Sequence, residues 1–203
     1  MVDVETSGFS PRTHRVIEIA IVLLDAAGRY QDEWSTLVNP LGDVGPTWVH
    51  GIRPRDVVDA PTFDDIAPQV MAQLAGRTFV AHNASFDLRF VSAELERAGW
   101  PLPETLPSLC TMRWSRKFVR GASQKLVDCC AAAGIDLLDA HFALGDARAT
   151  AELLAHYLGC SGGLAPWGPV IAQCDAYPWP LVMADDVAAS LACCVPRALG
   201  ARV

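Results

Sequence analysis

"VIEIAIVLLD" (residues 16–25) is the stretch of sequence that decides the fold. Apart from Glu18 and the closing Asp25, it is a continuous run of apolar residues, most of them β-branched. Such a run predicts a strand that is buried on both faces of a sheet. The following "AAGRY" supplies a glycine turn, and residues 33–40 alternate as expected for the returning strand of a hairpin.

Helical and strand-like segments alternate after this hairpin. Residues 63–74 predict a helix with Thr62 as its N-cap, and two brief strands are expected at residues 77–83 and 107–111. Further helices are expected over residues 84–99, 112–119, 123–135 and 143–159. Strands first, followed by strands alternating with helices, predict an α/β domain with a mixed sheet under helical cover.

The character of the chain changes near Cys160. "CSGGLAPWGP" and "YPWP" are rich in Gly, Pro and Trp, and residues 184–195 predict one short helix. We therefore divide the chain into a domain over residues 1–159 and a C-terminal extension over residues 160–203. The Trp and Leu residues of the extension argue against a disordered tail, so we expect it to dock on the body or on a partner.

Composition and charge exclude several classes of protein. The 203 residues carry a net charge of -7, so any polyanionic partner would require a local basic patch or bound metal ions. The seven cysteines form no CxxC pair, which suits neither a zinc site nor a disulfide framework and indicates a reducing cytoplasm. No signal peptide and no apolar run of about 18 residues is present, so we expect no membrane association.

Two acidic residues stand in a short strand at the start of the chain, "MVDVETSG". Asp3 and Glu5 are at positions i and i+2, which places both side chains on the same side of the strand. Burying carboxylates is unfavourable unless a cation or hydrogen bonds compensate them. Because "TSG" ends the strand, the pair would lie at its C-terminal edge, where open α/β sheets place their sites. The alternative is a solvated N-terminus.

Two further acids open predicted helices. Asp87, in "AHNASFD", falls in the first turn after a buried strand, and Asp146, in "HFALGDA", opens the helix over residues 143–159. Either one alone is explained by the favourable field at a helix N-terminus. Together with Asp3 and Glu5, however, they predict four carboxylates that converge on one edge of the sheet.

Four converging carboxylates would repel one another unless they hold cations. Hard oxygen ligands suit Mg²⁺ or Mn²⁺, and two such ions about 3.5–4 Å apart stabilise an in-line phosphoryl displacement. His141 precedes Asp146 by five residues on the loop that enters the helix. There it could accept a proton from an attacking water, although an exposed loop histidine is the alternative interpretation.

"DVETSG", "HNASFD" and "HFALGDA" resemble the three motifs of the DEDDh 3′–5′ exonuclease family, which includes the epsilon proofreading subunit of bacterial DNA polymerase III and ribonuclease T. The resemblance covers residues 1–158. It implies a ribonuclease H-like fold, with a mixed five-stranded sheet flanked by helices, and a mechanism with two divalent metal ions, Mg²⁺ or Mn²⁺. It also assigns the catalytic residues, with His141 as general base and four metal ligands: Asp3, Glu5, Asp87 and Asp146.

The resemblance also implies which residues contact the terminal nucleotide. Thr6, Ser7 and Gly8 would offer backbone or hydroxyl contacts, and Phe9 would wedge against the last bases, in the sequence-tolerant manner of aromatic stacking. A core position after a turn is the alternative for Phe9. His82 and Asn83 would line the pocket, or would only cap the corner between strand and helix.

These residues predict a metal-dependent 3′–5′ exonuclease that acts on a nucleic acid 3′ end. Single-stranded DNA is favoured, with an RNA-directed exoribonuclease like ribonuclease T or oligoribonuclease as the alternative, and a non-catalytic nucleic-acid-binding module as the second. A polymerase or a second copy of the chain is a candidate partner. Five basic residues within an acid-free stretch could bind backbone phosphates or form a solvated face: Arg113, Arg116, Lys117, Arg120 and Lys125. Glu18, in mid-strand, is left outside the predicted site.

Overall fold

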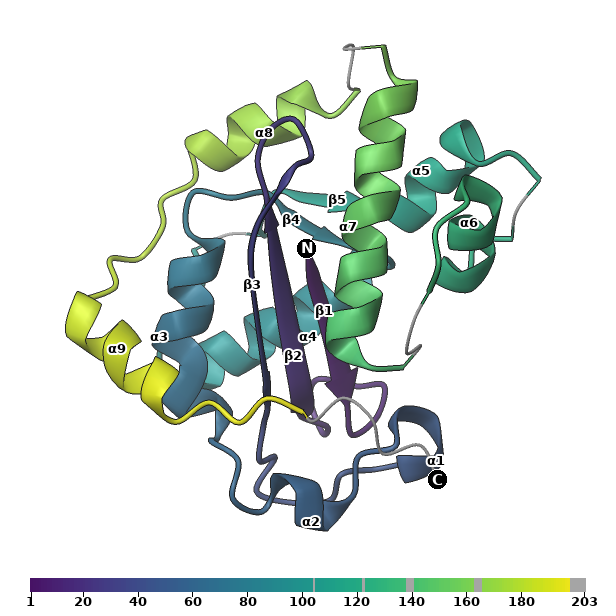
Figure 1. Cartoon of the computed structure of the whole chain (residues 1–203). Helices are drawn as coiled ribbons and strands as arrows, with labels where there is room; N and C mark the ends of the chain where they lie inside the picture. The colour runs from purple at the N-terminus through teal and green to yellow at the C-terminus, as the bar shows by residue number, and fades with distance from the viewer. Residues whose placement is uncertain (104, 122, 138–140, 163–165, 198–203) are drawn as a thin grey trace.

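The apolar run after residue 15 forms β2 (Val16–Leu24), the central strand of a three-stranded antiparallel sheet (Figure 1). It lies between β1 (Val2–Thr6) and β3 (Tyr30–Leu37). A second pair of strands, β4 (Phe79–Ala81) and β5 (Ser108–Cys110), is parallel. This computed structural model describes residues 1–103, 105–121, 123–137, 141–162 and 166–197.

Helices cover both faces of this sheet, as the sequence predicts. Residues Val2, Val4, Ile19 and Ile21 pack on one face against α3 (Phe63–Leu74) and α4 (Ala84–Arg97). On the other face lie α5 (Thr111–Phe118), α6 (Leu126–Ala133) and α7 (Ala143–Cys160). α7 presents small side chains to the strands, which lets it approach closely: Ala143, Ala147 and Ala151.

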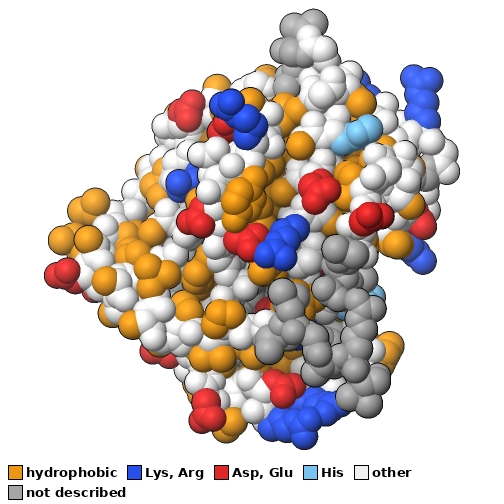
Figure 2. Space-filling model, viewed as in Figure 1, with side chains coloured by type: hydrophobic (Ala, Val, Ile, Leu, Met, Phe, Trp, Pro, Cys, Tyr) orange, Lys and Arg blue, Asp and Glu red, His pale blue; other side chains and the backbone are white. Residues whose placement is uncertain are grey.

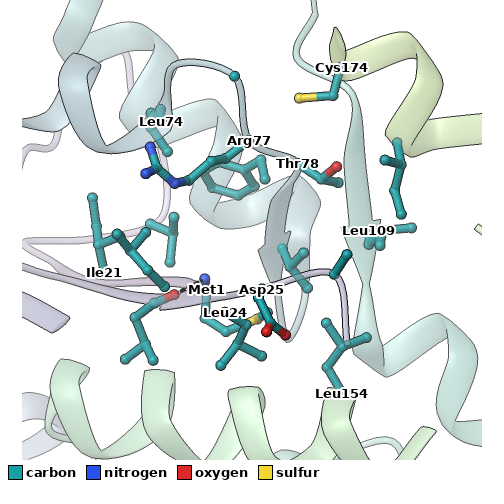
Figure 3. Close-up of a pocket in the computed structure, with 18 of the residues that line it drawn as sticks. Met1, Ile21, Leu24, Asp25, Leu74, Arg77, Thr78, Leu109, Leu154 and Cys174 are labelled. Carbon is teal, nitrogen blue, oxygen red and sulfur yellow. Dashed lines mark hydrogen bonds between the residues drawn. The ribbon is translucent and has the colours of Figure 1, made fainter. Parts of the chain in front are cut away.

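The five strands form two hydrogen-bonded groups rather than the single five-stranded sheet that we expected. β1 and β4 are neighbours, but the Val4 N–H donates to the Asp87 carboxylate at 3.3 Å. At the other end of β1, a cavity of about 220 Å³ lies between the two groups. Figure 3 shows side chains of Met1, Leu74 and Leu109 lining this cavity, from the start of β1, from α3 and from β5. A side-chain acceptor and a cavity therefore take the place of a backbone ladder.

The connection after β3 contains two single-turn helices, α1 (Thr47–His50) and α2 (Pro54–Val57). A small apolar cluster packs this connection against the sheet: Ile17, Leu37, Val44, Ile52, Val57 and Ala60. α1 places His50 beside the N-terminal end of β2, and the His50 side chain is buried there. The connection therefore forms a wall close to the acidic residues of β1.

The C-terminal residues run along the body of the protein. α8 (Gly168–Asp175), which the sequence did not predict, is followed by the predicted helix α9 (Ala184–Ala192). α9 packs along α3, and Val195 then accepts a hydrogen bond from the Leu37 N–H at 2.9 Å (Figure 1). Exposed apolar side chains on this segment include Leu181 and Met183, and Figure 2 shows hydrophobic side chains gathered on the same edge, over α9.

Two composition-based expectations concern thiols and membranes. All seven cysteines are free. Within the described ranges, no helix combines the length and the apolar character that crossing a bilayer requires.

Candidate active site

β1 carries the first two acids of the site. Asp3 lies opposite Ala20, and Glu5 lies opposite Glu18, in the ladder between β1 and β2. Because residues that face each other across a ladder point to the same side, Asp3, Glu5 and Glu18 share the face that packs on α7. The register shifts between Glu5 and Thr6, which pairs with Val16, so the ladder is irregular directly after the second acid.

The first turns of two helices bring the remaining acids. Asp87 is buried in the first turn of α4 and accepts the hydrogen bond from Val4 of β1. Asp146 lies in the first turn of α7, where its Oδ2 atom accepts the His141 N–H at 3.3 Å. Its Oδ1 atom is buried and has no hydrogen-bond partner among the described residues. This oxygen is free to bind a ligand that the chain itself does not provide.

His141 stands exposed on the loop before α7. Its backbone has a φ of 66°, a left-handed conformation that is uncommon for histidine and that the hydrogen bond to Asp146 supports. Ligand atoms of Glu5, His141 and Asp146 all lie within 4.8 Å of one another. The loop therefore brings an imidazole to the predicted acidic edge.

Burial, with a smaller contribution from neighbouring charges, raises the pKa values of these acids. Burial raises the pKa of Asp3 well above its usual range, and the nearby carboxylates of Asp87 and Asp146 raise it further. Burial, followed by the charge of Glu18, raises the pKa of Glu5 to about 8. Burial likewise raises the pKa of Asp87 to about 7.

Such an arrangement fits a divalent cation. Ionising several buried carboxylates together is unfavourable unless positive charge is brought to them. The carboxylate oxygens at this edge are hard ligands of the kind that suits Mg²⁺ or Mn²⁺. Glu5 and Asp146 are close enough to share one ion, and the unpartnered Oδ1 atom of Asp146 supplies a free oxygen.

The residues after β1 form a tight turn beside the acids. Ser7 is fixed in both directions, because its N–H donates to the Arg15 carbonyl and its Oγ accepts the Arg15 N–H, at 2.9 and 3.0 Å. Gly8 leaves room for the His14 ring, which would lie 2.3 Å from an added Cβ. The side chain of Phe9 is 84% exposed, so this residue is not part of the core. The turn thus presents a free aromatic ring on a fixed backbone, while Thr6 closes it with a hydrogen bond to the Gly8 carbonyl.

His82 and Asn83 hold the corner between β4 and α4. The His82 ring contacts the Thr111 hydroxyl at 2.9 Å and the Gln124 carbonyl at 3.0 Å, so both of its nitrogens are engaged. Burial lowers its pKa. Asn83 is the exposed N-cap of α4, with a φ of 104°. These contacts favour the structural interpretation of His82, whereas Asn83 remains accessible.

Two charged residues at this site were not identified from the sequence. Glu18 is fully buried beside Glu5, and its Oε2 atom accepts hydrogen bonds from Arg197 and from the Ala143 N–H, at 3.0 and 3.4 Å. The signal for Glu18 was a lone acid inside an otherwise apolar strand. Arg197 lies in the C-terminal extension, and no local pattern connects it with β2.

Comparison with known proteins identifies the family of this chain. The sequence profile of the RNase T exonuclease family matches residues 1–154. The PolC-type DNA polymerase III of Clostridium perfringens is 34% identical over 155 residues, which are 75% of this chain and 10% of the polymerase. The 3′-5′ exonuclease DinG of Bacillus subtilis is 37% identical over 108 residues, 51% of this chain and 11% of DinG. The chain thus spans about a tenth of the length of these curated relatives.

Solved structures show the same fold. Exonuclease X, in complex with 5′ overhanging duplex DNA, has a TM-score of 0.64 and 28% identity, covering 79% of this chain and 91% of its own. Escherichia coli Exonuclease I, in complex with a dT13 oligonucleotide, has a TM-score of 0.70 at 17% identity, covering 82% and 42%, and supports the fold alone. The predicted ribonuclease H-like fold class is confirmed. With a profile match over most of its length, this chain belongs to the RNase T exonuclease family.

Proposed function

We propose that this protein is a 3′–5′ exonuclease that hydrolyses nucleotides from the 3′ end of DNA. The observation that carries the proposal is the meeting of Glu5, His141 and Asp146 within 4.8 Å, beside the carboxylates of Asp3 and Asp87. These five residues come from three separate segments of the chain. Carboxylates held together without a compensating charge do not stabilise a fold, which argues against the non-catalytic binding module.

The acidic edge would hold two divalent metal ions, Mg²⁺ or Mn²⁺. Their ligands would be four carboxylates, Asp3, Glu5, Asp87 and Asp146, whose burial raises their pKa values in the absence of a cation. When bound, such ions stabilise the negative charge that develops on the attacking and leaving oxygens of a phosphoryl transfer.

His141 would act as the general base. Its exposed ring can be reached by water, and the hydrogen bond from its N–H to Asp146 fixes the loop that carries it. The imidazole would accept a proton from the water that attacks the phosphorus of the terminal phosphodiester. The bond to the 3′ oxygen of the shortened strand then breaks, that oxygen takes a proton from solvent, and the nucleotide leaves with a 5′ phosphate.

The turn after β1 would bind the terminal nucleotide. Thr6, Ser7 and Gly8 form its fixed backbone, and the exposed ring of Phe9 would stack on the last bases. Asn83, at the accessible end of α4, would line the same pocket. His82 would contribute indirectly, because its ring holds the corner between β4 and α4.

A basic surface on α5 and the segment after it would attract the phosphate backbone. Its five cations are all exposed, and Lys117 lies 5.7 Å from the centre of the Trp114 ring. The relatives that are PolC-type DNA polymerases and the DNA complex of Exonuclease X favour DNA over RNA. An RNA-directed activity is the second candidate, and the same assay distinguishes them.

The C-terminal extension would bind a partner or cover the sheet. We propose that residues 1–159 form the exonuclease domain and residues 160–203 an extension, for which a polymerase or a second copy is a candidate partner. Seven free cysteines support a reducing cytoplasm as the compartment. Size-exclusion chromatography of the full chain, alone and with a replicative polymerase, tests both partners.

A labelled single-stranded DNA, a duplex with recessed ends and a short RNA test the activity in one experiment. We expect shortening of the DNA from its 3′ end with Mg²⁺ or Mn²⁺ and none with EDTA. Asp146→Asn and His141→Ala should each lose activity, the histidine variant by about 10²-fold or more. Glu152→Gln changes an exposed acid on the same helix as Asp146 and should retain activity. No shortening of any substrate by the wild type would overturn the proposal.

A further inference from the structure

The C-terminal extension sends one charged side chain into the wall of the active site. The Arg197 guanidinium donates from Nη1 to Glu18 Oε2 at 3.0 Å and from Nη2 to the His50 carbonyl at 2.8 Å. It also lies over the Phe142 ring, 4.8 Å from the ring centre. Arg197 therefore joins β2, α1 and the loop before α7 through a single planar group.

The backbone around Arg197 is anchored independently of its side chain. Val195 accepts a hydrogen bond from the Leu37 N–H and donates its own N–H to the Thr36 hydroxyl, both at 2.9 Å. Cys193 and Cys194 pack against the core shared by α3 and α4. In Figure 1 this segment follows α9 and crosses the ends of the strands. The arginine is thus delivered on a fixed segment, which lowers the entropy lost in placing its side chain.

Arg197 compensates an unfavourable pair of charges. Glu18 is fully buried and faces Glu5 directly across the ladder, where like charges are destabilising. The other hydrogen-bond donor to Glu18 among the described residues is the Ala143 N–H at 3.4 Å, and the Oε1 atom of Glu18 has none. Without the guanidinium, Glu18 would be a buried carboxylate with almost no compensation.

Three consecutive residues of the catalytic loop depend on this ion pair. The His141 carbonyl accepts a long hydrogen bond from Arg197 Nη1, at 3.5 Å, and the Phe142 ring stacks under the guanidinium. The Ala143 N–H, at the start of α7, donates to Glu18. His141 also has a left-handed backbone, which persists only where the surroundings hold it.

We propose that Arg197 is a positioning residue of the active site: by pairing with Glu18 it holds the loop of residues 141–143 so that His141 faces the acidic edge. The inference rests on the proposed role of His141 as general base. It gives the C-terminal extension, which lies outside the family profile, a part in the chemistry of the domain.

Steady-state kinetics of Arg197→Ala and Arg197→Lys test the proposal. Removing a residue that orients a catalytic group commonly lowers activity about 10- to 100-fold, and we expect this loss in kcat with little change in KM. Lysine retains the charge but not the planar fork, so Arg197→Lys should recover only part of the loss. Guanidinium ion at millimolar concentration should restore activity to Arg197→Ala.

Arg148→Ala is the matched control. Arg148 also pairs with a glutamate, Glu33, and lies on α7, but this ion pair is partly exposed to solvent, whereas Glu18 is fully buried. Its loss should leave kcat and the response to guanidinium unchanged. If Arg197→Ala fails to fold, the double variant Glu18→Gln/Arg197→Ala removes the buried charge together with its partner and should show the same loss of kcat.

Hydrogen exchange provides a readout that does not depend on nuclease activity. Amides of residues 141–146 should exchange at least about 10-fold faster in Arg197→Ala than in the wild type, and at the wild-type rate in Arg148→Ala. A kcat within twofold of the wild type, or unchanged exchange in this segment, would overturn the role of Arg197. An inactive wild type in which the variant still shows faster exchange would instead overturn the proposed function and retain the structural role.

Discussion

Asp87 and Glu94 lie seven residues apart on α4, and both are buried, yet their surroundings are opposite. Glu94 accepts two hydrogen bonds from Arg15 Nε, at 2.8 and 3.0 Å, and one from the Val16 N–H at 3.0 Å. Arg97 adds a second cation at 3.3 Å. The chain itself therefore supplies the charge that a buried carboxylate requires.

Asp87 is stabilised by its own N–H and by that of Val4, and no cation pairs with it among the residues that the structure describes. Its hydrogen bond from Val4 stabilises the ionised form, but burial outweighs it, and the neighbouring charge of Asp146 adds to the rise in its pKa. One helix thus carries a carboxylate whose charge the chain compensates, Glu94, and another whose charge it leaves uncompensated, Asp87. The uncompensated carboxylate, Asp87, is on the edge where Asp3, Glu5 and Asp146 meet, and an added cation would be stabilising there.

Asp87→Asn should produce the largest effect, a loss of activity of about 10³-fold or more, because several kcal/mol of charge stabilisation would be lost with a metal ligand. The free energy of unfolding should stay the same or rise, because the substitution removes one of several repelling buried charges. Gel-based exonuclease assays and urea denaturation measure the two quantities. A variant that is both inactive and unstable would place Asp87 with Glu94 as a structural residue.

Glu94→Gln should show the converse behaviour. It breaks a buried ion pair and leaves Arg15 without its partner, so we expect a loss of about 3 kcal/mol in the free energy of unfolding. Activity per folded molecule should remain close to that of the wild type, since Glu94 contacts none of the acids at the end of β1. Arg29→Ala, which removes an exposed ion pair with Asp25, is the control and should change stability by less than about 1 kcal/mol.

The sequence predicted the uncompensated carboxylates at the edge of the sheet better than the compensated one, Glu94. Asp3, Glu5, Asp87 and Asp146 each stand at the end of a local element, so a strand or helix pattern was enough to place them at one edge. Their joint role and that of His141 stay predictions, while the fold class that carries them is confirmed.

What the sequence could not supply are contacts between distant segments. Glu18 looks like an isolated acid in a buried strand, and only the arrival of Arg197 from the C-terminal extension explains it. The hydrogen bond from the Val4 N–H to Asp87, which lies between the two groups of strands, likewise joins residues 83 positions apart. Neither periodicity nor composition carries such information.

Metal binding should also distinguish Asp87 from Glu94. Mn²⁺ at about 100 times its dissociation constant should stabilise the wild type by about 2.7 kcal/mol, because the ion binds the folded state. The stabilisation should persist in Glu94→Gln and fall sharply in Asp87→Asn. Thermal unfolding with and without Mn²⁺ measures it, and equal stabilisation of both variants would show that the ion binds elsewhere.

The smallest expected effect is on the pH dependence of stability without metal. Asp87 and Glu5, with pKa values of about 7 and about 8, keep their protons in the folded state after the unfolded chain has lost them near pH ~4. Their contribution to stability is therefore complete below pH ~4 and is lost as the pH rises through 7 and 8. The buried Met1 amine, whose pKa is lowered to about 5, acts in the opposite direction and is shared by all variants.

Subtracting the wild-type curve from that of a variant cancels the shared contribution of Met1 and leaves the contribution of the substituted carboxylate together with its effect on neighbouring acids such as Asp3. We expect the stability of Asp87→Asn relative to the wild type to increase as the pH rises from 5 to 8, because asparagine never ionises. Glu94→Gln keeps the acidic edge intact, so its difference from the wild type should not show that rise. Saturating Mn²⁺ should abolish the rise by favouring the ionised carboxylates of the wild type, and urea denaturation across this pH range measures each curve. A difference curve for Asp87→Asn that stays level without metal would mean that Asp87 is ionised throughout, and that the chain already supplies the charge it needs.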